Sequence, residues 1–432
     1  MPFETATSMP RKIAVIGAGI SGMGAAHLLA KDHRVVLFES EKRLGGHART
    51  KMAGKDKSTA VDTGFIVFNY ANYPNLTALF DHLGVPVEKS NMSFAASFDG
   101  GRFEYALQSL NSLFAKRSNI VNPQFYRFLR DLAVFNSRGL EASQEDGLTL
   151  AGLMTKLGLS DFFRDHYLVP FSGAIWSTPK SKIVDFPAAS LLKFFDNHAL
   201  LSVTGQHQWY TVSGGSIEYV SRLGADMVQR GVNVRLGAHV QGVRRTPKGV
   251  EIRCAGAEWE EFDEVIFATH SDDTLGLLSD ATLSEQSMLS AIRYQPNAVV
   301  LHSDTSVMPS RKRCWASWNY AEAKDAETDD IDLTYWMNSL QNIEGPENFM
   351  VTLNSNRKIR EELIWDECTL RHPVYDETAL AAQELASAIN GSNRTWFCGA
   401  WMKNGFHEDG LSSAYDVVHA LNAVERLSLA AE

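Results

Sequence analysis

The sequence predicts an α/β protein with a parallel sheet assembled from separated parts of the chain and a second, α+β domain built on an antiparallel sheet. The first 50 residues contain a strand, a glycine-rich turn, a helix and a second strand in that order, which is the pattern of a βαβ unit. Two further apolar strands, at 264–269 and 393–397, lie far along the chain. Four short strands, at 298–302, 314–320, 333–338 and 349–353, are separated by polar or Gly/Pro turns, as in antiparallel sheets. A helix is expected at 122–135.

The N-terminal unit begins with a strand from Lys12 to Ile16, followed by a turn with glycines at 17, 19 and 22. The first glycine allows a tight turn, the second lets the backbone approach a pyrophosphate, and the third lets the following helix lie against the sheet. The helix, expected from Ile20 to Ala30, offers free N–H groups to phosphates. These features predict a Rossmann-type dinucleotide site.

The residues after the second strand indicate which dinucleotide is bound. Glu39 ends that strand, about 20 residues after the turn, where a carboxylate accepts hydrogen bonds from ribose hydroxyls and repels a 2′-phosphate. NADP is therefore disfavoured. Arg43, Gly45, Gly46 and His47 follow directly, and this second loop is suited to wrap the other side of a pyrophosphate. Simple NAD enzymes do not need it, so the pattern favours FAD.

The C-terminal region supplies a further part of the expected FAD domain. The strand from Asn393 to Phe397 runs into a Cys-Gly-Ala-Trp sequence, and a helix is expected from Ser412 to Leu427. The N-terminus of this helix would stabilise negative charge on a reduced flavin ring. Strands are also expected at 232–236, 240–243 and 250–252. We therefore predict a discontinuous FAD-binding domain (1–74, 225–275 and 391–432) and a substrate-binding domain (75–224, mostly helical, and 276–390).

A series of short segments, spread over the whole chain, carries a family resemblance. These segments are Gly45 to Ala48, Val61 to Asn69, Tyr73 to Asn75, Met92 to Phe94, Ile175 to Ser177, Phe194 to His198, Gln208 to Val212, Gly214 to Ser216, Cys398 to Trp401 and Gly405 to Gly410. Over them the chain resembles the flavin amine oxidase and phytoene desaturase superfamily, and more narrowly the flavoprotein domain fused to plant cyclopropane fatty acid synthases and its free-standing bacterial relatives. The amine oxidases usually have Arg in place of His47, which favours the narrower relatives.

The resemblance implies an amine oxidase-like fold and completes the set of residues expected at FAD. In the family the backbone near Val240 meets the adenine, and the loop at Ala268 and Thr269 lies near the cofactor. The residues expected to bind FAD are Gly17, Gly19, Ile20, Ser21, Gly22, Glu39, Ser40, Arg43, Gly45, Gly46, His47, Thr63, Gly64, Phe65, Ile66, Val240, Ala268, Thr269, Gly399, Ala400, Asp409, Gly410 and Leu411.

Aromatic residues are numerous in the expected substrate domain. Nine Trp, twelve Tyr and 23 Phe are present, and they would suit an apolar tunnel for an acyl chain; ordinary core packing explains any single one equally well. The residues expected in the substrate pocket are Trp176, Trp209, Tyr210, Trp401 and Phe406.

The chemistry expected is direct oxidation of an organic substrate. After residue 50 no second GxGxxG turn follows, so a site for NAD(P)H as hydride donor is not expected. We predict an FAD-dependent oxidoreductase that abstracts hydride from a hydrophobic substrate and desaturates or isomerises a lipid acyl chain. Two alternatives are a flavin amine oxidase and a non-catalytic flavoprotein partner of a cyclopropane-synthase-like lipid methyltransferase.

No pair of nucleophile and base is assigned. His407 is the candidate proton acceptor, and the alternative is that it and the adjacent Glu408 and Asp409 are structural. Cys368 lies near the position where some amine oxidases link their flavin. A buried, inert thiol and a non-covalent FAD are expected instead.

Composition limits the remaining partners. A formal net charge of −10 disfavours nucleic acid, and 13 His without paired ligand spacing predict no metal site. Four Cys without a CxxC pair, and a polar segment from Met1 to Pro10, predict a cytoplasmic protein. Basic and aromatic residues mix at 125–130 and 311–315. Such segments occur in peripheral contacts at the inner face of a membrane, and a solvated charged helix face or strand end is the alternative explanation.

Overall fold

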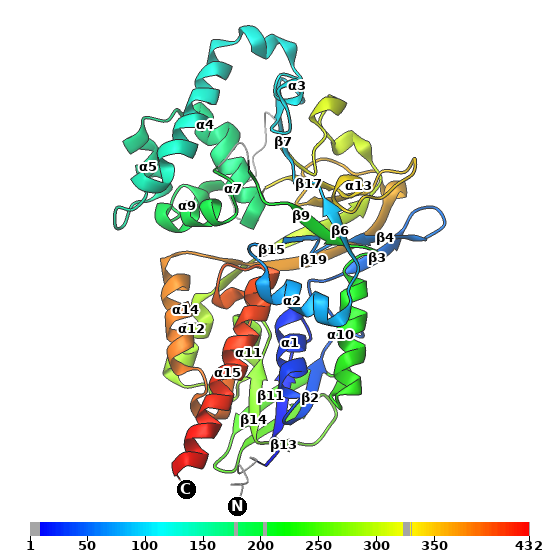
Figure 1. Cartoon of the computed structure of the whole chain (residues 1–432), viewed down its shortest axis with the longest axis vertical. Helices are drawn as coiled ribbons and strands as arrows, with labels where there is room; N and C mark the ends of the chain where they lie inside the picture. The colour runs from blue at the N-terminus through cyan, green and yellow to red at the C-terminus, as the bar shows by residue number, and fades with distance from the viewer. Residues whose placement is uncertain (1–8, 177–179, 202–204, 323–328, 330, 432) are drawn as a thin grey trace, which may run out of the picture.

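The computed structural model describes residues 9–176, 180–201, 205–322, 329 and 331–431. The first eight residues, which make up most of the segment where no targeting signal is expected, lie outside this part of the chain. The molecule consists of two bodies stacked along its long axis (Figure 1). The lower body holds both ends of the chain, and the upper body holds a large sheet and a group of helices beside it.

A five-stranded, fully parallel sheet forms the centre of the lower body. Its strand from Lys12 to Ile16 is almost wholly buried, because helices or a second sheet cover both faces, as parallel sheets require. All five strands were predicted, and the structure confirms them. In spatial order they are β10 (Asn233–Leu236), β2 (Arg34–Glu39), β1 (Lys12–Ile16), β14 (Glu264–Phe267) and β20 (Thr395–Phe397).

Four helices cover one face of this sheet. Gly24 lets two of them approach closely, because a Cβ added there would lie 2.5 Å from the Leu411 side chain. The last helix begins five residues before the expected Ser412, since the Asp409 carboxylate accepts a hydrogen bond from the Phe406 N–H (2.9 Å) and organises an earlier first turn. The helices are α1 (Ile20–Leu29), α2 (Pro74–Leu83), α10 (Ile217–Gln229) and α15 (His407–Ala431).

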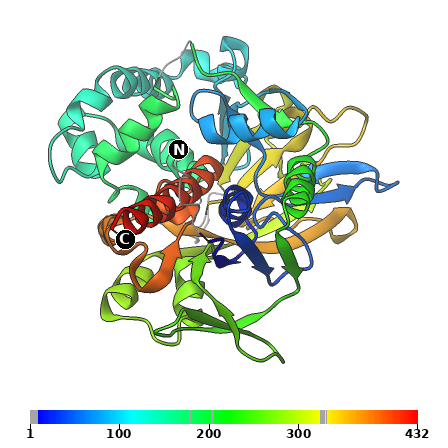
Figure 2. The ribbon, with the colours of Figure 1, turned by 60° about the horizontal axis from the view of Figure 1, so that its bottom comes forward.

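The other face carries a small sheet and three helices (Figure 2). Two of these helices lie in 276–390, which the sequence assigns to the substrate domain. They pack instead on the parallel sheet, because their apolar residues, such as Met288 and Ala379, meet Ile16 and Phe397. The elements are β11 (Val240–Arg245), β12 (Val250–Cys254), β13 (Glu260–Phe262), α11 (Ser271–Leu277), α12 (Leu283–Ala291) and α14 (Glu377–Ile389).

The upper body is built on a seven-stranded sheet that is mostly antiparallel, with one parallel pair between its sixth strand and the strand before it. The expectation that 75–224 is mostly helical is wrong for 94–106, which supplies two strands. The run from Phe94 to Phe98 is buried throughout, so it lacks the alternation that marks a half-exposed strand. In order the strands are β19 (Ile364–Val374), β15 (Arg293–His302), β18 (Met350–Leu353), β17 (Leu333–Trp336), β16 (Trp318–Glu322), β7 (Phe94–Phe98) and β8 (Phe103–Ala106).

Two expected strand boundaries need correction. The strand expected from Cys314 starts only at Trp318, because a helical turn, η4 (Lys312–Cys314), precedes it. The strand expected to reach Asn338 ends at Trp336, where the short helix α13 (Met337–Leu340) begins.

Helices cover one side of the large sheet (Figure 1). The longest, expected at 122–135, runs further, to Ala142. Its aromatic residues Phe125, Phe128 and Phe135 are fully buried in the upper core. The helices and turns are α3 (Leu110–Leu113), η1 (Arg117–Val121), α4 (Pro123–Ala142), α5 (Leu150–Leu157), α6 (Asp161–Phe163), α7 (Val169–Trp176), α8 (Lys180–Ile183) and α9 (Ala188–Asn197). None of the helices described is both long and apolar enough to pass through a bilayer.

Two small sheets join the bodies, and a buried carboxylate links their elements. One is the hairpin of β3 (Thr50–Ala53) and β4 (Thr59–Asp62); the other contains β5 (Val67–Asn69), β9 (Trp209–Val212) and β6 (Val87–Ser90). Asp62, 1% exposed, accepts hydrogen bonds from the Thr50 hydroxyl (2.5 Å) and from the N–H (2.9 Å) and hydroxyl (2.7 Å) of Ser216. The Gln341 side-chain amide donates a further one (3.0 Å). One side chain thus ties together β3, β4, the start of α10 and the end of α13.

The buried position of Asp62 predicts a pH dependence of stability. Burial raises the pKa of Asp62 to about 6, above its value of about 4 in an unfolded chain, so the folded state holds the proton more tightly. Stability should therefore fall by at most about 3 kcal/mol as pH rises from about 4 to about 6, and then level off. Urea unfolding across this range should show the fall in the wild type. In Asp62→Asn, whose side chain stays neutral, this fall in the free energy of unfolding should be absent. An equal dependence of that free energy on pH in both proteins would contradict the assignment.

Candidate active site

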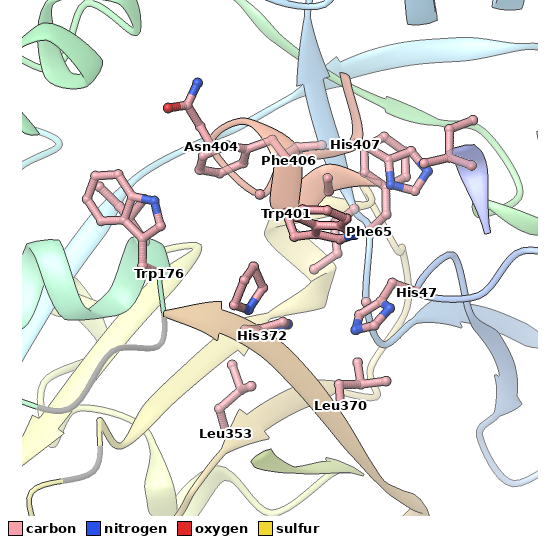
Figure 3. Close-up of a pocket in the computed structure, with 18 of the residues that line it drawn as sticks. His47, Phe65, Trp176, Leu353, Leu370, His372, Trp401, Asn404, Phe406 and His407 are labelled. Atoms are coloured by element: carbon pink, nitrogen blue, oxygen red, sulfur yellow. The ribbon is translucent and has the colours of Figure 1, made fainter. Parts of the chain in front are cut away.

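A large cavity of about 1860 Å³ lies between the two bodies (Figure 3). Pockets for single small ligands usually measure about 300 to 1,000 Å³, so this one has room for more than one molecule. Its lower walls come from the ends of β1, β2 and β14, and its upper walls from α4, α7 and α9.

The glycine turn forms the floor of the lower part. Gly17 has φ +99°, and a Cβ added to Gly22 would lie 1.8 Å from the Gly17 carbonyl oxygen, so both glycines are required by the turn itself. Gly19 differs, since a Cβ added there would have no atom within 4 Å and Gly19 lines the cavity. The backbone at Gly19 is therefore open to a bound group.

The structure brings most of the predicted FAD residues together from distant parts of the chain. Those that line the cavity are Gly17, Gly19, Ile20, Ser21, Glu39, Ser40, Gly45, Gly46, His47, Thr63, Gly64, Phe65, Ile66, Val240, Ala268, Thr269, Gly399 and Ala400. Gly22, Arg43, Asp409, Gly410 and Leu411 do not line it. Gly22 and Gly410 lie instead where backbone segments meet closely, and Leu411 is buried.

Arg43 holds the second loop in place from behind. Its guanidinium donates hydrogen bonds to the carbonyl oxygens of Gly46 (2.9 Å) and Ala48 (3.1 Å) and pairs with Glu41 (2.8 Å). The sequence predicts that Arg43 contacts a pyrophosphate, but its guanidinium supports the loop and does not line the cavity. The loop then lies close to the glycine turn, because a Cβ on Gly46 would come within 2.9 Å of Gly19 Cα.

Glu39 lines the lower cavity, as do Val240 and the two residues before it, Ala238 and His239. Its carboxylate accepts hydrogen bonds from the N–H groups of Ala18 (2.8 Å) and Glu41 (2.8 Å). These two bonds fix the carboxylate between the two loops, at the place where the sequence predicts the ribose.

Three histidines, His47, His270 and His372, lie close together on the wall of the lower cavity, and Figure 3 shows two of them, His47 and His372. The ring of His47 lies 5.7 Å from that of His270 and 5.7 Å from that of His372. Burial lowers the pKa of all three, to about 3 for His270 and His372, and the neighbouring imidazole of His47 contributes to both. The rings are therefore neutral. Sequence analysis missed His270 and His372; the only local signal was the position of His270 directly after the predicted strand and Thr269.

His47 presents an unpaired atom to this region. Its Nε2 is buried and has no hydrogen-bond partner among the described residues, while a hydrogen bond from the ring to the Arg371 carbonyl raises its pKa slightly against the effect of burial. A buried polar atom without a partner is costly, so the site suits a ligand that supplies one.

His407, the candidate proton acceptor, is held by its neighbours. Its Nε2 lies 2.6 Å from the Tyr219 hydroxyl, and its ring stacks on Phe65 at 3.9 Å. Burial lowers the pKa of His407 to about 3, which makes it a weak base. The adjacent Glu408 accepts hydrogen bonds from Leu76 N–H (2.9 Å) and from Asn75, and so caps α2. Both contacts favour the structural alternative.

The residues of the lower cavity fit a dinucleotide. The open face of Gly19 leaves space against the first turn of α1, and the helix N-terminus there suits a pyrophosphate. The unpaired Nε2 of His47 adds a polar contact for the cofactor's ring system. Cys368 lies on β19 outside the cavity lining, and burial raises the pKa of its thiol, so a covalent link through this residue is not favoured.

The profile of the family described as "Flavin containing amine oxidoreductase" matches residues 20–338, which include the glycine turn, the second loop and most of the upper body. The chain belongs to this family. It is therefore an FAD-dependent oxidoreductase, and its lower cavity is lined by most of the residues that the sequence predicts at FAD.

Curated relatives match a short stretch of the chain. An L-amino-acid oxidase of Sistrurus catenatus edwardsii is 47% identical over 47 residues, which is 11% of this chain and 9% of the relative. Another, of Bothrops pauloensis, is 43% identical over 53 residues, which is 12% of this chain and 10% of the relative. The chain thus aligns with only about a tenth of the length of these relatives.

Several solved structures share the fold over almost the whole chain. A CLA-producing fatty acid isomerase from P. acnes has a TM-score of 0.68 and 17% identity, covering 96% of this chain and 99% of the other. A putative protoporphyrinogen oxidase from Exiguobacterium has a TM-score of 0.66 and 15% identity, covering 95% of this chain and 98% of the other. A putrescine oxidase has a TM-score of 0.65 and 14% identity, covering 96% of this chain and 99% of the other. At these identities the likeness shows the fold alone.

Aromatic residues contribute to the cavity walls of this flavoprotein. Of the residues expected in the substrate pocket, Trp176, Trp209, Trp401 and Phe406 line the cavity, whereas Tyr210 does not. Trp209 and Tyr210 are neighbours on β9, so their side chains point to opposite faces. Tyr210 packs against Tyr70 at 5.0 Å instead.

The open face of Gly19 gives a test of the FAD site. Gly19→Ala should fold normally, because the backbone at Gly19 is in the extended region and the new methyl group meets no protein atom. The methyl group would occupy cofactor space, and FAD affinity should fall at least about tenfold. Flavin fluorescence titration measures the affinity, and the melting temperature of the apoprotein should be unchanged. Gly22→Ala should instead lower that temperature; the opposite pattern would contradict these assignments.

Proposed function

We propose that this flavoprotein takes hydride from an uncharged, hydrophobic substrate and desaturates or isomerises a lipid acyl chain. FAD, when bound, supplies the acceptor for that hydride. The observation that carries the proposal is the absence of charge on the described walls of the upper cavity. The residues that line it there come from α4, α7 and α9, and they include Leu129, Leu132, Phe171, Ile175, Trp176 and Phe194.

Charged residues on the described cavity walls occur only in the lower part, and they are already engaged. Arg371 pairs with Asp272 (2.6 Å) and Asp273 (2.5 Å), and Glu39 lies at the nucleotide end. An ammonium group in the upper cavity would find no carboxylate, and burying an unpaired charge is expensive. An amine substrate is therefore disfavoured, although a putrescine oxidase shares the fold.

Two polar atoms in the upper cavity suit a neutral oxygen or nitrogen atom on the substrate. Asn136 Oδ1 and Trp318 Nε1 are buried and have no hydrogen-bond partner among the described residues. One accepts and the other donates, so they could orient a hydroxyl or ester group without any charge. The likeness to a fatty acid isomerase is consistent with an acyl substrate but does not decide it.

The two candidate reactions differ in what the protein must supply. A desaturation removes a hydride and a proton from adjacent carbons, so it needs a proton acceptor. An isomerisation returns the hydride to another carbon of the same chain and needs none. His198 lines the cavity with its Nδ1 close to the Phe194 carbonyl oxygen (2.9 Å), which leaves Nε2 available as an acceptor. The other contribution of the walls is to position the chain and exclude water.

Flavin absorbance under anaerobic conditions tests the substrate class. Methyl linoleate or dioleoylglycerol, which are both uncharged, should bleach the flavin or yield a chain with a new or moved double bond, while a panel of primary amines should do neither. Mass spectrometry of the chain separates desaturation from isomerisation, which leaves net absorbance unchanged. Turnover of amines with hydrogen peroxide would instead support an amine oxidase. No reaction with either class would favour a non-catalytic partner of a lipid methyltransferase.

A cavity-filling substitution tests where the chain lies. Leu132→Trp, on the cavity side of α4, should lower kcat/KM for the acyl substrate at least about tenfold, because the indole would occupy the space of several methylene groups. Leu140→Trp, on the same helix but outside this cavity and also half-buried, is the matched control. Flavin content should be unchanged in both variants. Equal activity of the two would contradict the proposed chain position.

A further inference from the structure

We propose that the tip formed by residues 105–130, together with η4, docks on the surface of an anionic lipid bilayer. This inference rests on the proposed function and deepens it, because it names the place where an acyl chain enters. The tip comprises the end of β8, α3, η1 and the start of α4. It lies at the end of the molecule farthest from both termini (Figure 1).

Exposed apolar side chains gather at this tip. Of the twelve large apolar residues that are exposed in the described chain, five fall between 107 and 126. Leu110 is 77% exposed and Val121 is 81% exposed. Leu107, Ile120 and Tyr126 complete the set. Single exposed apolar residues are ordinary, but a cluster of them marks a contact surface.

The same segment carries only positive charge. Residues 105–130 include Lys116, Arg117, Arg127 and Arg130 but no Asp or Glu, in a chain with a net charge of −10. The turn η4 contacts α3 and adds the exposed Lys312 and Arg313. Basic residues around protruding apolar ones are typical of surfaces that bind anionic membranes.

Two carboxylates border the segment, and both are buried. Glu104, which precedes it, accepts hydrogen bonds from the Arg311 guanidinium (2.7 Å), the Ser97 hydroxyl (2.8 Å) and the Ser310 N–H (2.7 Å), so its charge is already paired within the protein. Asp131, which follows it, pairs with Arg130 (3.3 Å). The cations that remain available to lipid phosphates are the half-buried Lys116 and the exposed Arg117, Arg127, Lys312 and Arg313.

The tip is continuous with the upper cavity. Leu107, Leu110 and Leu113 line that cavity, and the first two are also exposed at the tip. An acyl chain could therefore pass from a bilayer into the cavity along apolar side chains without crossing water. A protruding end, rather than a concave groove, suits insertion among lipid headgroups, and this favours a bilayer over a protein partner.

Co-sedimentation with vesicles tests the proposal on the FAD-loaded protein. Vesicles of phosphatidylglycerol and phosphatidylcholine in equal parts should bind it, and vesicles of phosphatidylcholine alone should bind it far more weakly. High salt should weaken binding to the anionic vesicles, because it screens the cations. Val121→Asp and Arg127→Glu should each lower the partition coefficient roughly tenfold.

Two matched controls separate docking from general surface effects. Leu283→Asp changes a residue of similar exposure, 84%, in the lower body. Arg138→Glu lies three turns along α4 from Arg127. Both should bind as the wild type does, and equal loss in tip and control variants would overturn the proposal. So would failure of the wild type to bind either vesicle, which would leave an acidic protein as the partner of this surface.

Vesicle binding and substrate turnover are independent results. Binding without any reaction of acyl substrates would support the docking surface and contradict the proposed function. Reaction with methyl linoleate without vesicle binding would support the proposed function and contradict the docking surface.

Discussion

One buried carboxylate joins the two bodies of the molecule. Asp62 accepts hydrogen bonds from elements on both sides of the cavity: from Thr50 and Ser216 near the dinucleotide unit and from Gln341 at the end of α13. Because its own N–H donates to the Gln341 side chain (2.9 Å), the contact is reciprocal. Loss of this contact would leave the buried carboxylate with fewer hydrogen bonds, which is costly, so the joining of the two bodies and the stability of the fold are coupled at this residue.

The cavity between the bodies is electrostatically divided. Its lower part has the N-terminus of a helix, a fixed carboxylate at Glu39 and the three neutral rings of His47, His270 and His372. Its upper part has aliphatic and aromatic walls with two unpaired neutral polar atoms. A charged, hydrophilic cofactor and an uncharged chain are therefore each matched to one part. This division, and not the shared fold, is the basis of the proposal that the substrate is an acyl chain and not an amine.

Sequence analysis predicted the dinucleotide unit well because its information is local. The turn from Gly17 to Gly22, the strand that ends at Glu39 and the apolar strand at 264–267 each follow from patterns of a few residues. It assigned α12 and α14 to the other body, since an amphipathic helix does not record which sheet it covers. It also missed β7, because a strand buried on both faces has no alternation to recognise.

The sequence by itself determined the class of cofactor and the glycines that make space for it, since these depend on contacts between near neighbours. Only the tertiary structure decided that Arg43 supports a loop, that Tyr210 points away from the cavity and that three histidines from distant segments meet. It also decided that the upper cavity lacks charge and opens beside an apolar, basic tip. These properties arise where chain segments hundreds of residues apart pack together, and no local pattern encodes which side chains will face one another there.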